Sequence, residues 1–153
     1  MHILWTITYT PAQLPLLAAK LLAELQTASP FCLWLSGPLG AGKTTLTAQL
    51  LRQLGLPEDE PVTSPTYTYM NEYEVSSSWY AHLDLYRTRG DVSSEDLGLA
   101  DARNFRGIFV EWPELSPDDP YLRPTHALDI AFANAGAERT YTLRVPKAKV
   151  PRL

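Results

Sequence analysis

One glycine-rich segment constrains the fold of this chain more than any other feature of its sequence. Residues 37–44 have the sequence Gly-Pro-Leu-Gly-Ala-Gly-Lys-Thr, which matches the Walker A pattern GxxxxGK[ST]. The apolar run Phe31–Leu35 precedes this segment and predicts a strand buried on both faces of a parallel sheet. Leucines at helical spacing follow it, and Gly55 ends the helical pattern. The sequence therefore predicts a strand, a glycine-rich turn and a helix in this order.

The glycine-rich segment predicts a nucleotide-binding site. Glycines allow consecutive backbone N–H groups to turn toward phosphate oxygens, and the start of the following helix adds partial positive charge at the same point. Lys43 would contact the β- and γ-phosphates, and the Thr44 hydroxyl would bind Mg²⁺. The sequence lacks the guanine-specific pattern Asn-Lys-x-Asp, and this absence favours ATP over GTP. The residues expected to bind the nucleotide here are Gly40, Ala41, Gly42, Lys43, Thr44 and Thr45.

The periodicity of apolar residues predicts the other elements. Residues 3–9 alternate as in a strand, and a helix follows that Thr10 and Gln13 can cap, with Pro11 in its first turn. This helix should end before Ser29-Pro30. Further strands are expected at Tyr67–Glu74, Trp79–Leu85, Gly107–Glu111, Leu128–Phe132 and Tyr141–Val145, with a hairpin joining the last two.

The length and composition suit one compact domain. The chain has 153 residues, of which 45% are hydrophobic. This length and hydrophobic content suffice to form a core without disulfide bridges. We expect residues 1–153 to form a single P-loop ATPase domain, with a basic, flexible tail over about 147–153. The order of the predicted elements favours an α/β fold, a P-loop NTPase-like three-layer domain whose sheet is mostly parallel with an antiparallel extension.

The charge and the cysteine content exclude several classes of protein. With 13 Lys and Arg against 17 Asp and Glu, the net charge is −4, which argues against a nucleic-acid-binding protein with a large basic face. The single cysteine, Cys32, cannot form an internal disulfide, as is typical of a protein of the reducing cytoplasm. No stretch has the pattern of a signal peptide or a membrane span. We therefore expect a cytoplasmic location and no membrane partner.

Two acidic residues are candidates for the chemistry at the phosphates. Glu111 follows the apolar run Ile108–Val110, at the carboxyl end of a predicted buried strand, where ligands bind in open α/β sheets. Asp84 shares one face of its predicted strand with His82. Each acid has an ordinary alternative, since Glu111 can be a solvated strand end and Asp84 can belong to the polar outer face of an antiparallel strand. His82 alone carries little information, because a lone histidine on a strand is more often structural than catalytic.

Five segments, taken in order, carry a resemblance to a known family. They are residues 37–45, Ser64-Pro65-Thr66-Tyr67-Thr68, His82-Leu83-Asp84-Leu85-Tyr86-Arg87, Leu97-Gly98-Leu99 and Val110-Glu111-Trp112-Pro113-Glu114. This combination resembles the TsaE family, formerly called YjeE or YdiB, of small bacterial P-loop ATPases required to form threonylcarbamoyladenosine (t6A) on tRNA. The resemblance runs from about Thr10 to Glu114. Ala100-Asp101 departs from the acidic pair usual in the family, and the tail from Tyr121 is family-like only in its hairpin pattern.

The resemblance implies a role for several residues. Thr44 and Glu111 would form the Mg²⁺ side of the site, and Thr66 would belong to a switch-like loop near the γ-phosphate. Asp84 would lie near the γ-phosphate and its attacking water, and Trp112 would pack beside the site. The residues expected to be catalytic are Lys43, Asp84 and Thr66.

The resemblance also implies an adenine site and partners. Adenine would lie between Thr10, at the start of the first helix, and Arg139, in the late hairpin. The ATPase would not modify tRNA itself. It would dock on the proteins TsaB and TsaD, the latter transferring threonylcarbamoyl to adenosine of tRNA, and ATP hydrolysis would reset that complex between turnovers. Contact with tRNA would be indirect, through the complex.

Two other functions are compatible with a Walker A motif. A small-molecule kinase would need an acceptor pocket and an arginine-bearing lid, for which the stretch Arg87–Arg106 supplies irregularly spaced arginines. A nucleotide-dependent switch module would act by changing its loops rather than by turnover. Labelled ATP separates a kinase from an ATPase, because a kinase yields phosphorylated product whereas an ATPase releases phosphate.

Overall fold

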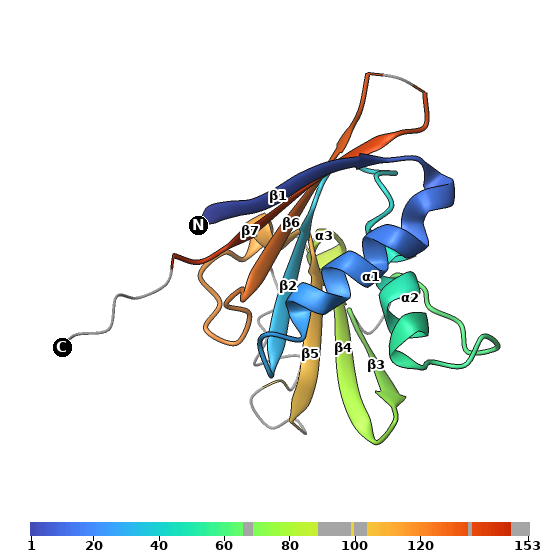
Figure 1. Cartoon of the computed structure of the whole chain (residues 1–153). Coiled ribbons are helices and arrows are strands. Elements are labelled where there is room, and N and C mark those ends of the chain that lie inside the picture. The colour runs from blue at the N-terminus through green and yellow to red at the C-terminus, as the bar shows by residue number, and fades with distance from the viewer. Residues whose placement is uncertain (66–68, 89–98, 100–103, 135, 148–153) are drawn as a thin grey trace.

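The fold is built around one seven-stranded mixed sheet (Figure 1). The computed structural model describes the chain except residues 66–68, 89–98, 100–103, 135 and 148–153. The elements in chain order are β1 His2–Tyr9, η1 Pro11–Gln13, α1 Leu14–Leu25, β2 Phe31–Ser36, α2 Lys43–Leu54, β3 Met70–Val75, β4 Ser78–Asp84, α3 Leu85–Thr88, β5 Phe105–Glu111, η2 Pro113–Leu115, β6 His126–Phe132 and β7 Arg139–Val145.

The strand order in the sheet is β1-β7-β6-β2-β5-β4-β3. The central strands β6, β2, β5 and β4 pair in parallel, with β2 and β5 in the middle. Antiparallel pairs complete both edges: β7 and β1 on one side, and β3 on the other. The α/β fold and the predicted hairpin between β6 and β7 are therefore confirmed. The expectation of a mostly parallel sheet is wrong, because three of the six strand pairs are antiparallel and the sheet is mixed.

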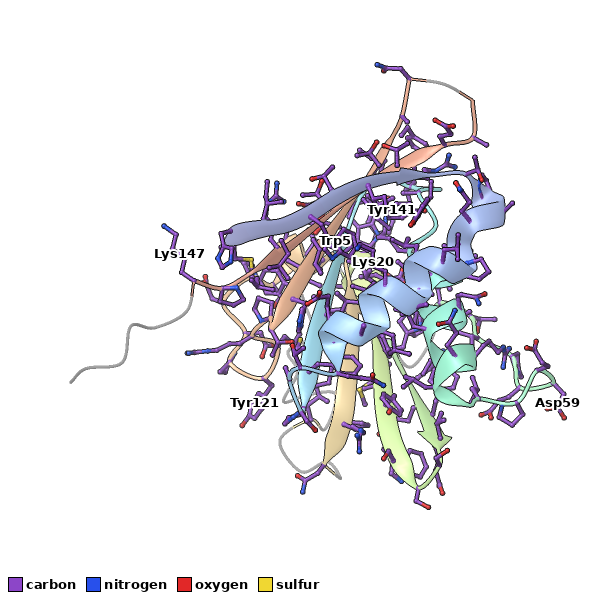
Figure 2. The ribbon with its side chains drawn as sticks, viewed as in Figure 1. Trp5, Lys20, Asp59, Tyr121, Tyr141 and Lys147 are labelled. Carbon is purple, nitrogen blue, oxygen red and sulfur yellow. The ribbon has the colours of Figure 1, made fainter. Side chains whose placement is uncertain are left out.

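Helices α1 and α2 cover one face of the sheet (Figure 1). Their leucines pack on inward-facing residues of β2 and β5, and Lys20 of α1 lies 5.3 Å from the ring centre of Trp5 in β1 (Figure 2). The fully buried side chains of this core include Leu17, Leu21, Leu33, Leu35, Leu46, Leu50 and Phe109. Burial of each large apolar side chain stabilises this layer by about 1.5–3 kcal/mol.

The opposite face of the sheet differs from the expected three-layer arrangement. In the part of the chain that the structure describes, this face is covered by short α3 and η2 and by the irregular segment that follows η2, not by long helices. Prolines at positions 113, 117, 120 and 124 prevent a continuous helix there. Hydrogen bonds attach this segment to β2: Trp34 Nε1 donates to the Leu122 carbonyl at 2.7 Å, and Thr125 N–H donates to the Cys32 carbonyl at 2.9 Å.

The first helix begins as the sequence predicts. Thr10 N–H donates to Gln13 Oε1 at 2.9 Å, as in a capping box, and the first turn is the 3₁₀ helix η1 before α1 starts at Leu14. Helix α2 starts earlier than its leucine pattern, at Lys43 directly after the glycine-rich loop. Among the described residues, no helix has the length and apolar character required to cross a membrane.

The strand predicted at Tyr67–Glu74 is shorter at its beginning. Strand β3 starts at Met70, because Tyr69 has a φ of 61° and so leaves the extended conformation; residues 67 and 68 lie outside the described residues. At its other end β3 turns directly into β4 through Ser76 and Ser77, whose φ angles of 51° and 67° suit a two-residue hairpin turn. Leu85, predicted as the end of a strand, instead begins α3.

Gly107 leaves room for an aromatic ring between β2 and β5. It is the register partner of Phe31, and a Cβ atom at Gly107 would lie 2.2 Å from Phe31 Cζ. The Phe31 ring is packed edge-on against Phe109, with ring centres 5.5 Å apart. The ring therefore has little freedom to move away from an added methyl group.

We predict that Gly107→Ala destabilises the protein by about 1–3 kcal/mol, because the added methyl overpacks the core against Phe31. Urea denaturation followed by circular dichroism measures this change. The matched test is the same substitution in a Phe31→Leu background, where the loss should be smaller. Equal losses in both backgrounds would contradict the assigned clash.

His126 at the start of β6 predicts a pH dependence of stability. The side chain is 3% exposed, and its Nδ1 lies 2.8 Å from Thr125 Oγ1. Burial lowers its pKa below 6.5, although a backbone hydrogen bond and the charge of Glu24 oppose the shift. A depressed folded-state pKa means that the unfolded chain binds more protons just below pH 6.5, so this contribution to stability falls as pH falls through that window.

We therefore predict that the wild type loses more stability than His126→Gln when pH is lowered from about 7.5 to about 5. The free energy of unfolding in urea, measured for both proteins across this range, gives the comparison. The difference between the two proteins removes the effect of the carboxylates, which titrate in both. Parallel curves would show that His126 titrates alike in the folded and unfolded states.

Candidate functional site

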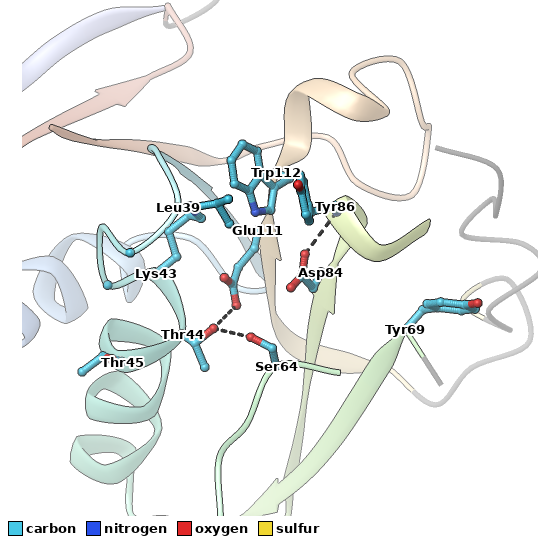
Figure 3. A pocket seen from close by; sticks show the side chains of 12 residues that line it. Leu39, Lys43, Thr44, Thr45, Ser64, Tyr69, Asp84, Tyr86, Glu111 and Trp112 are labelled. Carbon is cyan, nitrogen blue, oxygen red and sulfur yellow. Dashed lines mark hydrogen bonds between the residues drawn. The ribbon is translucent and has the colours of Figure 1, made fainter. Parts of the chain in front are cut away.

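The candidate site lies where three parallel strands end side by side. Strand β2 runs into the glycine-rich loop and α2, and its residue Leu35 is the register partner of Glu111 in β5. Glu111 is in turn the register partner of Asp84 in β4. The structure therefore brings the two predicted acids next to each other and beside the loop, at the carboxyl edge where ligands bind in open α/β sheets (Figure 3).

The glycine-rich loop owes its shape to backbone conformation. Gly40 and Gly42 have φ angles of 79° and 100°, and no heavy atom lies within 4 Å of the Cβ that either residue lacks. Glycine is required there by its backbone angles rather than by crowding. Gly42 is the N-cap of α2, so the first N–H groups of a twelve-residue helix face the space above the loop.

A cavity of about 680 Å³ opens above this loop, within the range of about 300–1,000 Å³ usual for small-molecule sites. The predicted acids Asp84 and Glu111 line it. Of residues 40–45, which are predicted to bind the nucleotide, the cavity is lined by Gly40, Gly42, Lys43, Thr44 and Thr45. Ala41 is the exception, since its side chain is buried in the core beneath the loop.

A chain of hydrogen bonds joins four side chains at the floor of the cavity. Thr44 Oγ1 donates to Glu111 Oε2 at 2.8 Å and lies 2.6 Å from Ser64 Oγ (Figure 3). Because a hydroxyl has one hydrogen, Ser64 is then the donor to Thr44. His82 Nε2 contacts the same Glu111 oxygen at 2.5 Å. Glu111 is thus held from two sides, by α2 and by β4.

Lys43 is folded over its own loop. Its Nζ donates to the carbonyl oxygens of Gly37 at 2.6 Å and Pro38 at 3.0 Å, and it lies 4.1 Å from the ring centre of Trp112. Burial lowers the pKa of Lys43, while the negative charges of nearby acids, Glu111 first, oppose the shift. The ammonium group is therefore placed at the cavity with partners that an anionic ligand can replace.

Trp112 covers one side of the cavity because the chain turns sharply after Glu111. Its φ and ψ of 60° and 48° are left-handed, a conformation that costs a non-glycine residue energy and is concentrated at functional sites. Its ring stacks on Tyr86 with centres 4.9 Å apart. Tyr86 N–H donates to Asp84 Oδ1 at 3.1 Å, so the start of α3 orients this acid (Figure 3).

The oxygen atoms at the floor of the cavity suit a hard cation. Thr44, Ser64 and Glu111 bring two hydroxyl oxygens and a carboxylate together within hydrogen-bonding distance. In the described part of the chain, no group of three or more His, Cys, Asp or Glu side chains is arranged to hold a metal ion. Mg²⁺ at nucleotide sites needs only one or two protein ligands, since phosphates and water supply the others. The residues present therefore fit Mg²⁺ bound together with a phosphate ligand.

The remaining predicted site residues lie elsewhere. Thr66 falls outside the described residues. Tyr9 is the register partner of Arg139, so the segments that contain Thr10 and Arg139 are neighbours, but neither residue lines the cavity. Arg139 packs on the ring of Phe132 at 4.4 Å, and its Nε is buried with no partner among the described residues.

Sequence reasoning missed or undervalued several residues of the candidate site. Ser64 and His82 complete the hydrogen-bond chain, and Leu39, Tyr69 and Tyr86 also line the cavity. A signal for His82 existed in its spacing from Asp84, because residues two apart on a strand share a face. For Ser64 the signal was its place beside Thr66 in the expected switch-like loop, but no local pattern indicated its contact with Thr44, twenty residues away.

Comparison with known proteins identifies the family to which this chain is similar. A family model described as "Threonylcarbamoyl adenosine biosynthesis protein TsaE" matches residues 8–141. The tRNA threonylcarbamoyladenosine biosynthesis protein TsaE of Haemophilus influenzae is 39% identical over 97 residues, which cover 63% of this chain and 60% of that protein. The Bacillus subtilis protein of the same name is 38% identical over 105 residues, covering 68% and 62%. The chain thus spans about 60% of the length of the curated relatives it matches.

A solved structure extends the likeness over most of the fold. The crystal structure of Bacillus subtilis YdiB superposes with a TM-score of 0.59 and 28% sequence identity, covering 95% of this chain and 88% of that one. The family model runs from the end of β1 to the first residues of β7 and includes every residue of the hydrogen-bond chain. The resemblance inferred from the sequence is confirmed: this chain belongs to the TsaE family.

Proposed function

We propose that this chain binds ATP with Mg²⁺ in the cavity and hydrolyses it to ADP and phosphate, as an accessory factor in the formation of threonylcarbamoyladenosine on tRNA. One observation carries this proposal: the glycine-rich loop, Lys43 and the acids Asp84 and Glu111 meet at one cavity above the start of α2. The similar proteins of Haemophilus influenzae and Bacillus subtilis are named for threonylcarbamoyladenosine biosynthesis, and these names support the choice of process.

The loop and the start of α2 bind the phosphates. Backbone N–H groups around Gly40 and Gly42 offer hydrogen bonds, and the helix start adds partial positive charge. Lys43 leaves the carbonyl oxygens of its own loop and donates to the β- and γ-phosphates instead. This exchange replaces bonds to neutral oxygens with bonds to charged ones, which are stronger.

Thr44 and Glu111 would hold the Mg²⁺. When bound, the ion would supply positive charge to neutralise the negative charge that develops during phosphoryl transfer. Glu111 accepts the hydroxyl hydrogen of Thr44, which leaves an oxygen lone pair of Thr44 for a cation. Asp84, beside Glu111 and oriented by Tyr86, accepts a hydrogen bond from the attacking water. Thr66, two residues after Ser64 in the sequence, is proposed to act at the γ-phosphate.

The proposed partners are TsaB and TsaD. In this proposal the chain contacts tRNA only through that complex, in keeping with its net charge of −4. Hydrolysis of ATP resets the TsaB–TsaD complex between turnovers in the cytoplasm. Isolated P-loop domains often hydrolyse ATP slowly until a partner orders their loops or supplies charge. Weak turnover by the chain alone is therefore expected.

We predict that Lys43→Ala weakens ATP affinity roughly ten- to a hundred-fold, because a charge-assisted contact worth about 1.5–3 kcal/mol is lost. Calorimetric titration with ATP and Mg²⁺ measures the affinity. Lys147→Ala is the matched control, since it removes an exposed lysine from the end of the chain far from the loop. Unchanged affinity in a folded Lys43→Ala protein would overturn the nucleotide site.

The function is tested by steady-state phosphate release, with and without TsaB and TsaD from the same source. We expect the complex to accelerate release, and mass spectrometry should show that many turnovers of tRNA modification require this protein and its Lys43. Modification that proceeds equally without the chain would remove the proposed role. Transfer of labelled phosphate to a small molecule, rather than its release, would favour a kinase.

Glu111 and Asp84 should have separable effects. We predict that Glu111→Gln reduces the enhancement of ATP affinity by Mg²⁺, because an amide is a poorer ligand for a hard cation than a carboxylate. Asp84→Asn should lower hydrolysis more than binding. Titrations with and without Mg²⁺, together with turnover rates, distinguish the two acids, and the reverse pattern would exchange their roles.

A further inference from the structure

His82 is a fully buried polar residue below the cavity floor. It lies on β4 with Asp84 on the face toward α2, whereas Ala81 and Leu83 pack in the core of the opposite face. Its relative exposure is 0%, and it does not line the cavity. Any influence of His82 on a bound ligand therefore passes through a residue that does line it.

That residue is Glu111. His82 Nε2 lies 2.5 Å from Glu111 Oε2, the same oxygen that accepts the Thr44 hydroxyl at 2.8 Å. An ionised carboxylate can only accept hydrogen bonds, so the Nε2 atom of His82 carries the hydrogen. The carboxylate is clamped between a donor from β4 and a donor from α2, and its orientation toward Thr44 depends on both.

The other ring nitrogen of His82 is not used in the same way. His82 Nδ1 is buried and has no hydrogen-bond partner among the described residues. A buried polar atom without a partner is unfavourable, and His82 is the register partner of Phe109, whose ring belongs to the apolar core. The contact with Glu111 is thus the interaction at this position that an apolar side chain would not reproduce.

We propose that His82 is a positioning residue that orients the Glu111 carboxylate toward Thr44 and thereby sets the Mg²⁺ dependence of nucleotide binding. The proposal rests on the proposed function, because it concerns the cation side of the same site. A glutamate side chain rotates about several bonds, and a fixed hydrogen bond selects the rotamer in which its oxygen faces Thr44. Partners of this kind behind metal-binding groups typically change affinity or activity by about 10–100-fold.

Two variants of matched polarity test this role. In His82→Gln the amide nitrogen falls near the position of Nε2 and can still donate to Glu111, whereas in His82→Asn it falls near Nδ1 and cannot reach. Calorimetry should measure ATP affinity for each variant with Mg²⁺ and with EDTA. We expect His82→Asn to lose about tenfold or more of the affinity measured with Mg²⁺, with little change in EDTA, and His82→Gln to recover most of that loss.

A second comparison tests whether His82 acts through Glu111. In a Glu111→Gln background, His82→Asn should cause no further loss in Mg²⁺-dependent affinity. Equal Mg²⁺ dependence in His82→Gln, His82→Asn and wild type would overturn the proposal, as would equal impairment of both variants or additive losses in the double variant. A wild type that does not bind ATP would instead refute the proposed function, so the two failures are distinguishable.

Discussion

The parallel pairing of β2 with β5 places Glu111 opposite Leu35, and the contacts of the candidate site depend on this register. Ser36 alone separates Leu35 from the glycine-rich loop, so the carboxylate and the start of α2 meet at the same end of the sheet. A shift by one residue would turn Glu111 to the opposite face, away from Thr44 and among apolar side chains. The core around Phe109 opposes such a shift, because Phe109 would leave its packing against Phe31.

Buried polar groups are concentrated at this end of the sheet. Of the six buried polar or charged side chains among the described residues, four lie at or directly below the cavity: Lys43, His82, Asp84 and Glu111. Removing such groups from water is unfavourable unless they have partners, and most of their partners here are one another or the loop backbone. The left-handed Trp112 adds local backbone strain at the same point. These buried polar groups and the strained backbone at Trp112 therefore cost stability, and together they preorganise a site whose residues suit an anion and a cation.

Local patterns in the sequence predicted the helices and strands but not which strands are adjacent in the sheet. The Walker A segment between an apolar strand and a leucine-patterned helix, the capping box at Thr10 and the late hairpin all appear in the structure. Alternation also predicted that His82 and Asp84 share a face. It did not show that β4 pairs in parallel with β5, which makes this face part of a buried site rather than the outer face of an antiparallel strand. The short turn at Ser76 and the left-handed Tyr69 were likewise outside any apolar pattern.

By itself the sequence determined the glycine-rich loop, most strands and the family, because glycine placement, apolar periodicity and ordered motifs are properties of contiguous residues. The tertiary structure alone decided which strands are adjacent and which polar side chains meet. Thr44 and Glu111 are 67 positions apart, and His82 and Glu111 are 29 apart. Their hydrogen bonds form because strand order and register bring these positions together, and neither is encoded in the spacing of residues along one element.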